Sequence, residues 1–428
     1  MPASPPQVDL GRGLTSYLRL LGHPPARSPF LAIVVGRLSM AMAPIGILLL
    51  IQGSRGTYSL AGVVTGAYAV GSALGTPVWG RLMDRFGQVR VLVPTASASA
   101  LLLAGLALAG VGTAPPGVLV ALATLAGFSY PPMSPALRSA WRVIFPDRES
   151  RRVAFALDAT SVELIFVGGP LLLSLLLAVT PPVVPLLVTA ATLATGTLAY
   201  CRTDAARLSA PGRRPGLPGD AGTGDAGTGA RRSAVTAPGV VALLLVMATL
   251  SVGFGQLDTS MAATAGVLLG GTDRVGLLFT AIASGSAAGG LVYGARRWSF
   301  DERQAVPVLL TAFAVLLAAM AGLMSLPEVP LWAVFPLLFC TGASIAPTLI
   351  MQQNLLDQLS PAHRLNEAQA FLSASNTTGA ALGTALAGVV IDARGLGFSF
   401  AGAATFAAAA ALVALASRRR WRAAILVD

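Results

Sequence analysis

The chain has 428 residues, of which 54% are hydrophobic and only 11% are charged, and its mean hydropathy is +0.73. A soluble domain carries about 25% charged residues, so this composition excludes a soluble globular protein. The net charge of +11 comes from 29 arginines without any lysine, and we expect it to set membrane orientation rather than to bind nucleic acid.

Long unbroken apolar runs predict membrane-spanning helices, whereas the strands of a β-barrel would alternate apolar and polar residues. Residues 1–28 contain five prolines and no signal-peptide pattern, so we expect an uncleaved cytoplasmic segment. Within it, residues 10–21 are typical of either a short interfacial helix or a frayed tail. Cys201 and Cys340 lie far apart in apolar runs and indicate no disulfide framework.

Six apolar runs follow in residues 29–201, which we expect to form one helical bundle. Each run ends at proline, glycine or charged residues, which break or bound helices. The predicted spans are 29–52, 58–79, 89–111, 118–140, 153–179 and 183–200.

Residues 202–238 are rich in glycine, alanine, proline, aspartate and arginine, and contain the sequence DAGTG twice. Such a segment cannot bury enough apolar surface to fold, and it predicts a flexible cytoplasmic linker. Its glycines also suggest a phosphate-binding loop. That alternative lacks the lysine and the flanking strand and helix that such a loop requires.

Residues 239–417 contain six more apolar runs, which predict a second bundle, and residues 418–428 form an expected cytoplasmic tail. The spans are 240–262, 275–293, 306–324, 331–352, 368–391 and 398–416. With the N-terminus in the cytoplasm, 25 of the 29 arginines fall on the cytoplasmic side. The excess of arginine on that side predicts that both termini and the linker are cytoplasmic.

The two halves of the chain are related by an internal repeat. Residues 71–80 and 285–294 are identical at six of ten positions, at an offset of 214 residues. At an offset of 215, four residues of the first half have identical counterparts in the second: Gly127, Ser129, Pro132 and Pro146 match Gly342, Ser344, Pro347 and Pro361. The repeat indicates a duplication of six spans, the arrangement of transporters whose substrate site lies between two bundles.

The loop between the second and third spans, residues 80–92, reads GRLMDRFGQVRVL. It resembles the signature loop of the major facilitator superfamily, although Gln88 and Val89 replace two residues that are usually basic. A glycine at position 80 would let two helices approach closely, and a glycine at position 87 can turn the chain. Asp84 can lie against a helix N-terminus or an arginine.

The resemblance implies an all-α protein of twelve spanning helices in two six-helix bundles. It also implies that this loop is a cytoplasmic latch, which holds the bundles together when the substrate site faces outward. The latch residues would be Gly80, Asp84, Arg85, Gly87 and Arg90. The corresponding loop of the second half has no aspartate in register, and we interpret Arg296 and Arg297 there as topology anchors.

A second resemblance concerns the drug/proton antiporter branch of the superfamily. Gly169 and Pro170 in the fifth span match the centre of that branch's motif, but the glycines that should follow are absent. The intramembrane arginine of its fourth helix is also missing, because Arg138 lies too near the cytoplasm. The chain is therefore similar to that branch, with diverged motifs.

Three ionisable residues are predicted deep inside the first bundle, where they are functional candidates by default. Arg37 lies about 12 Å into its span, Asp158 about 8 Å and Glu163 about 15 Å from the same face. Arg37 can pair with either carboxylate, and Asp158 is closer to it in depth. Glu163 is the candidate proton carrier, and a structural ion pair is the alternative.

The remaining site candidates are polar residues of the cavity walls or gates. Asp258 is predicted near the outer end of the seventh span, as a gate or capping residue. The others are Gln256, Gln352, Asn376 and Tyr130.

These features predict a secondary transporter of the bacterial plasma membrane, which exports a small, moderately hydrophobic compound against proton entry. Uptake or uniport of a small polar solute is the alternative within transport, and a non-transporting receptor or scaffold is the alternative outside it. A membrane enzyme would need clustered ligating residues, and both His23 and His363 lie outside the spans. We expect a monomer in the lipid bilayer, with substrate and protons as partners and no metal or cofactor.

Overall fold

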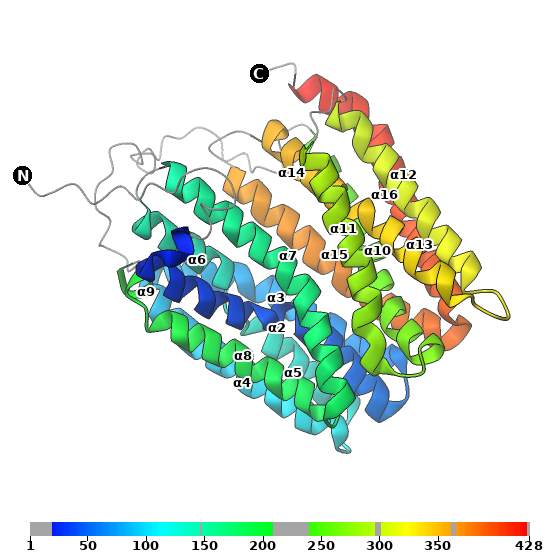
Figure 1. The fold of residues 1–428 in the computed structure, drawn as a ribbon, viewed down its shortest axis with the longest axis horizontal. Helices are drawn as coiled ribbons and strands as arrows, with labels where there is room; N and C mark the ends of the chain where they lie inside the picture. The colour runs from blue at the N-terminus through cyan, green and yellow to red at the C-terminus, as the bar shows by residue number, and fades with distance from the viewer. Residues whose placement is uncertain (1–18, 146–147, 209–238, 296–300, 361–364, 426–428) are drawn as a thin grey trace, which may run out of the picture.

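The computed structural model describes residues 19–145, 148–208, 239–295, 301–360 and 365–425. These residues form helices and connecting turns without any strand, and the helices assemble into two bundles (Figure 1). Helices cover all twelve predicted spans, which confirms the all-α membrane fold. Residues 10–18 of the predicted interfacial helix lie outside the described part of the chain, and residues 19–22 are helical.

The first bundle contains eight described helices, which run in the order of the predicted spans (Figure 1). They are α2 (Pro24–Arg55), α3 (Tyr58–Phe86), α4 (Gln88–Val111), α5 (Pro116–Phe128), α6 (Met133–Ile144), α7 (Arg148–Val179), α8 (Val183–Cys201) and α9 (Asp204–Leu208). The short helix α9 lies within the predicted linker, and its Ala205 and Ala206 are buried. Residues 204–208 of the predicted linker are therefore helical and pack against the first bundle.

The second bundle repeats this order of helices. They are α10 (Val240–Leu268), the 3₁₀ turn η2 (Thr272–Arg274), α11 (Val275–Ala295), α12 (Glu302–Leu323), α13 (Leu331–Ala343), α14 (Ile345–Leu359), α15 (Leu365–Arg394) and α16 (Leu396–Ile425). Helix α10 extends six residues beyond the predicted seventh span, which moves the middle of that span towards Asp258.

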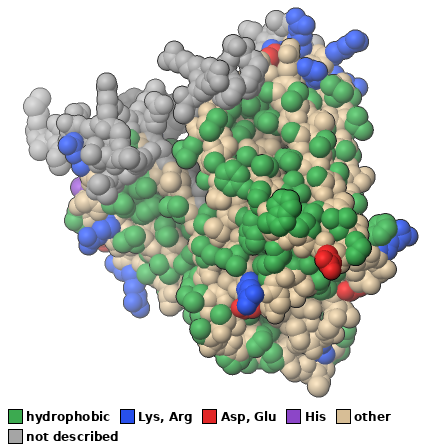
Figure 2. Space-filling view, turned by 45° about the vertical axis from the view of Figure 1, so that its right-hand side comes forward, with side chains coloured by type: hydrophobic (Ala, Val, Ile, Leu, Met, Phe, Trp, Pro, Cys, Tyr) green, Lys and Arg blue, Asp and Glu red, His purple; other side chains and the backbone are tan. Residues whose placement is uncertain are grey.

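Eleven segments of the described chain are long and apolar enough to cross a membrane. Helix α3 is not among them, although its 29 residues cover the predicted second span. Glycine, serine, threonine and tyrosine lower its hydropathy, as expected for a helix that packs closely against others. On one flank of the molecule, hydrophobic and small side chains cover most of the surface and charged ones are few (Figure 2).

The fourth and tenth spans are each interrupted, which the sequence analysis did not predict. Helix α5 ends at Phe128 and α6 begins at Met133, and Pro131 and Pro132 between them lack the N–H that a continuous helix needs. In the second half the break between α13 and α14 is a single residue, Ser344. The two breaks occupy corresponding positions of the repeat.

The sequence repeat corresponds to a repeated helix crossing within each bundle. A Cβ atom on Gly127 of α5 would overlap the carbonyl oxygen of Tyr68 in α3. A Cβ atom on Gly342 of α13 would likewise overlap the carbonyl oxygen of Ile282 in α11. Gly71, Gly75, Gly285 and Gly289 face backbone carbonyls across the same two crossings. The matched glycines therefore let two backbones touch at equivalent places in both halves.

We expect Gly127→Ala to lower the free energy of unfolding by about 1–3 kcal/mol, because the new methyl group overlaps backbone that cannot move aside. Gly80→Ala is the matched control, because a Cβ atom at Gly80 would meet nothing within 4 Å. Thermal unfolding of the purified protein in detergent measures both variants. Equal midpoints for Gly127→Ala and the wild type would contradict the assignment of this crossing.

The two bundles contact one another at the end of the molecule away from the start of α2 and the end of α16 (Figure 1). We call this end the far end, and we call the opposite one, where α2 starts and α16 ends, the linker end. There Gly62 of α3 packs on the backbone of Thr384 in α15, and the Gly276 N–H of α11 donates to Ser174 Oγ of α7 at 2.6 Å. If the linker end is cytoplasmic, as the arginines predict, this arrangement is closed to the outside.

Candidate functional site between the two bundles

A buried ion pair joins α2 to α7 in the first bundle. Arg37 Nη1 lies 2.5 Å from Asp158 Oδ1, and the two residues are only 1% and 4% exposed. The structure thus pairs Arg37 with Asp158. Glu163 lies one and a half turns further along α7, and its side chain is outside the described part of the structure.

Arg37 is held in place by close packing of its own helix. A Cβ atom on Gly196 of α8 would clash with the backbone of Gly36, the residue before Arg37, and a Cβ atom on Gly36 would clash with the sulfur of Met133. Arg37 Nε and Nη2 are buried and have no hydrogen-bond partner among the described residues. A buried charge with one partner depends strongly on that partner, so the pair fixes α2 to α7.

Tyr130 connects this region to the break in the fourth span. Its hydroxyl lies 3.1 Å from Ser39 Oγ on α2, and Ser39 Oγ donates to the Gly36 carbonyl at 2.6 Å. The carbonyl of Phe128, released where α5 ends, accepts from Trp79 Nε1 of α3. Because side chains of α2 and α3 bind the broken segment, its irregular backbone is held in a defined position.

Helix α10 carries the candidate carboxylate of the second bundle. Gln256 packs on Gly402 of α16, and Ser260 Oγ lies 2.7 Å from Ser399 Oγ of the same helix. Two residues correspond to about 200° around a helix, so Asp258, midway between them, lies on the side of α10 opposite α16. The side chain of Asp258 is exposed there, whereas the residues on either side of it are buried.

The depth of Asp258 differs from the sequence-based expectation. It lies ten residues before the end of α10 at Leu268, which is about 15 Å of helix. The predicted span ended at residue 262 and therefore placed Asp258 too close to the outer surface. No described residue forms an ion pair with Asp258.

The other polar candidates of the second bundle have different surroundings. Asn376 of α15 is exposed, and its Oδ1 accepts a hydrogen bond from Ser251 Oγ of α10 at 2.7 Å. Ser251 and Asp258 are seven residues apart, so they lie on nearly the same face of α10. Gln352 is 1% exposed, and neither atom of its amide has a hydrogen-bond partner in the part of the chain that the structure describes. Of these residues, Asp258 and Asn376 present polar atoms on an accessible surface.

The signature loop lies at the linker end. Gly87 has φ of 90°, and its N–H donates to the Met83 carbonyl at 2.9 Å, so this glycine turns the chain between α3 and α4. Arg85 and Arg90 are exposed. Gly80 lacks the close helix contact that the sequence led us to expect, and the side chain of Asp84 lies outside the described part of the structure.

Comparison with known families matches residues 30–368 to the Major Facilitator Superfamily. This match covers more than half of the chain. The chain belongs to the major facilitator superfamily. A comparison with curated protein sequences finds no match.

Solved structures of superfamily transporters share the fold at low sequence identity. A bacterial homologue of the human lysosomal transporter Spinster, inward-facing and occupied, has a TM-score of 0.65 at 14% identity, over 95% of this chain and 98% of that one. The nucleoside transporter NupG has a TM-score of 0.65 at 13% sequence identity, over 91% of this chain and 99% of that one. A bacterial homologue of the iron transporter ferroportin, in an inward-facing state, has a TM-score of 0.67 at 15% sequence identity, over 96% of this chain and 99% of that one.

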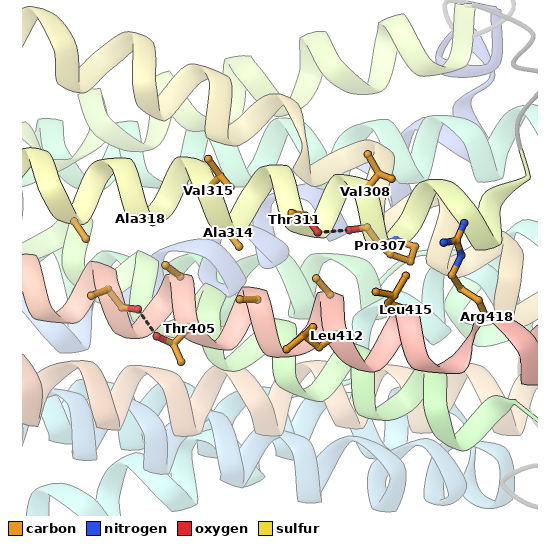
Figure 3. Close-up of a pocket in the computed structure, with 15 residues that line it drawn as sticks. Pro307, Val308, Thr311, Ala314, Val315, Ala318, Thr405, Leu412, Leu415 and Arg418 are labelled. Atoms are coloured by element: carbon orange, nitrogen blue, oxygen red, sulfur yellow. Dashed lines mark hydrogen bonds between the residues drawn. The ribbon is translucent and has the colours of Figure 1, made fainter.

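One cavity of this superfamily transporter lies away from the site candidates. It has a volume of about 830 Å³ and lies between α12 and α16 (Figure 3). Its lining is apolar apart from Arg418 at one end, and the hydroxyls of Thr311 and Thr405 donate to carbonyls of their own helices. None of the candidate residues lines it.

Sequence reasoning missed the interrupted helices of this superfamily transporter. The signal was present, since Pro132 and Pro347 were recognised as matching positions of the repeat. Interrupted helices in corresponding positions of two halves are a known pointer to the binding site of secondary transporters. The helix breaks that contain Tyr130 and Ser344 therefore indicate the position of the site independently of the ionisable residues.

Proposed function

We propose that this superfamily transporter exports a small, moderately hydrophobic compound in exchange for protons, by alternating access between its two bundles. The observation that supports proton coupling most directly is the exposed carboxyl group of Asp258. Asp258 lies about 15 Å before the end of the spanning helix α10, on the side of that helix that faces away from α16.

A carboxylate at membrane depth must either pair with a cation or become protonated. Asp158 has Arg37 as its partner, whereas Asp258 has no described cation. Asp258 is therefore suited to exchange a proton, or a cationic group of a substrate, with water that enters between the bundles. Glu163 is a second candidate proton carrier, because the sequence predicts that it lies deep within the fifth span.

A motif match and a charge pairing support the direction of transport and the nature of the substrate. Gly169 and Pro170 keep the centre of the drug/proton antiporter motif, and Gly169 packs closely on Ala41 of α2. The named neighbours transport different compounds on one fold, so the fold itself does not select the substrate. A paired Arg37 leaves no described free arginine beside the carboxylates for a polar anion, which favours an apolar or basic compound.

Transport in proteoliposomes with an imposed pH gradient tests this proposal. A panel of fluorescent apolar and basic dyes first identifies a transported compound. Asp258→Asn mimics the protonated carboxyl group, so this variant should still exchange the dye across the membrane at equal pH. Its response to the pH gradient should fall at least about tenfold, a loss of roughly 1.4 kcal/mol of coupling.

The matched control is Glu328→Gln, which removes an exposed carboxylate from the turn after α12. It should retain both dye exchange and the response to the pH gradient. If Asp258→Asn keeps the full response, the proton carrier is not Asp258, and Glu163→Gln becomes the decisive variant. If both variants keep it, neither residue is the proton carrier. A wild-type protein whose dye transport does not respond to the pH gradient would overturn proton coupling itself.

A further inference from the structure

A carboxylate of the second bundle binds the first turn of a helix in the first bundle. Asp392, near the end of α15, accepts three hydrogen bonds from the start of α3. Its Oδ1 accepts the Tyr58 N–H at 3.0 Å, and its Oδ2 accepts both the N–H and the hydroxyl of Ser59 at 2.6 Å. The sequence analysis did not single out Asp392, because its partners lie more than 330 residues away.

Helix α3 has no capping group of its own at this end. The first N–H groups of any helix lack partners within the helix and carry a partial positive charge, which a nearby carboxylate stabilises. The N-cap residue, Thr57, makes no side-chain capping hydrogen bond, and the first turn contains no acidic residue. The cap of α3 is therefore supplied by the other bundle.

Close backbone packing surrounds these hydrogen bonds. Gly388 lies one turn before Asp392, and a Cβ atom there would overlap the Tyr58 carbonyl. Gly62 and Gly66 of α3 pack in the same way on the backbone of α15 at Thr384 and Ala381. Because these contacts form the closed far end, separating the bundles there must break all three hydrogen bonds of Asp392 together.

We propose that Asp392 is a positioning residue of the transport cycle, which holds the far end closed by capping α3 of the opposite bundle. This inference rests on the proposed alternating-access function. Helices α3 and α15 are antiparallel, since Gly62 contacts Thr384 whereas Tyr58 contacts Gly388. The end of α3 that carries Asp84 therefore lies at the same end of the molecule as the start of α15, at Leu365.

Helices α3 and α15 thus each carry an aspartate near the C-terminus. Each aspartate lies at the end of the molecule where the other helix begins. Asp392 caps α3 when the far end is closed. In the latch that the signature loop implies, Asp84 would act at the end of the molecule where α15 begins. Rocking of the bundles would exchange one tie for the other, so that each of the two closed states gains a carboxylate contact that the other state lacks.

Pulsed electron paramagnetic resonance distances across the far end test the role of Asp392. Spin labels are placed on Ser54→Cys and Glu328→Cys, in the full-length protein with Cys201 and Cys340 replaced by serine. Both label sites are exposed at the far end, one in each bundle. Asp392→Ala should raise the fraction of molecules with the far end open by about fivefold, the effect expected for loss of one helix cap.

Two comparisons separate an inter-bundle tie from simple helix capping. Asp301→Ala removes the cap of α12, where Asp301 accepts the Arg303 N–H at 3.0 Å within one bundle. It should leave the distance distribution unchanged. Thr57→Asp gives α3 a cap of its own and repels Asp392, so it should open the far end without loss of folded protein.

The proposal is overturned if Asp392→Ala and Thr57→Asp both leave the far-end distances unchanged, or if Asp301→Ala shifts them equally. Should Asp392→Ala fold poorly, Asp392→Asn and Thr57→Asp provide the same readout. The measurement needs no substrate and no pH gradient. The distance measurement therefore gives the same result if the proposed substrate or coupling ion is incorrect. The proposal of proton-coupled export and the proposed role of Asp392 can fail independently.

Discussion

Asp158→Asn should prevent the protein from accumulating as a stable, folded membrane protein. This change leaves Arg37 charged, buried and without its partner, in a site where no described residue binds its Nε or Nη2. Breaking a buried ion pair by removing one member costs about 3–5 kcal/mol, which is a large fraction of the stability of most proteins.

The double variant Arg37→Met, Asp158→Asn provides the diagnostic control. It removes the stranded charge and replaces the arginine by an apolar side chain of similar length, so much of the lost stability should return. Size-exclusion chromatography and thermal unfolding in detergent measure all variants. Glu163→Gln should fold like the wild type. An Asp158→Asn protein as stable as the wild type would show that the pair is not a structural link.

Asp84→Asn should reduce transport at least about tenfold while the protein still folds and inserts. The change keeps the size of the side chain but removes the charge that a helix N-terminus or an arginine prefers. A loss of roughly 1.4 kcal/mol from the state closed at the linker end lowers the population of that state about tenfold.

Dye transport in proteoliposomes measures this effect, and labels across the linker end report the population directly. Asp84→Glu keeps the charge and should recover part of the activity. A wild-type rate for Asp84→Asn would mean that the match to the signature loop has no mechanical role. Asp84→Asn combined with Asp392→Ala should shift the balance between states less than either change alone, because both states lose their tie.

Composition and internal repeats were sufficient to predict the fold. The apolar runs gave twelve spans because helices must satisfy their backbone within the membrane, and the matched glycines marked equivalent crossings in both halves. Short-range patterns also predicted the turn at Gly87. These features depend on residues that are close in sequence, or on a repeat that compares two parts of one chain.

Contacts between distant residues were beyond sequence reasoning. Depth alone favoured Asp158 over Glu163 as the partner of Arg37, but only the packing of α2 on α7 brings the two atoms together. The role of Asp392 depends on the register between α3 and α15, which no local pattern encodes. Gly80 was misassigned because the close contacts of α3 fall at Gly71 and Gly75 instead.

The glycine crossings have a consequence for how motion passes through the protein. At Gly127 and Gly342 the backbones of paired helices touch, without a layer of side chains between them that could change rotamer and absorb a displacement. Helix α3 spans 29 residues, about 43 Å, and is joined to α5 in this way. A tilt imposed at Tyr58 should therefore move α3 and α5 together as one unit at this crossing.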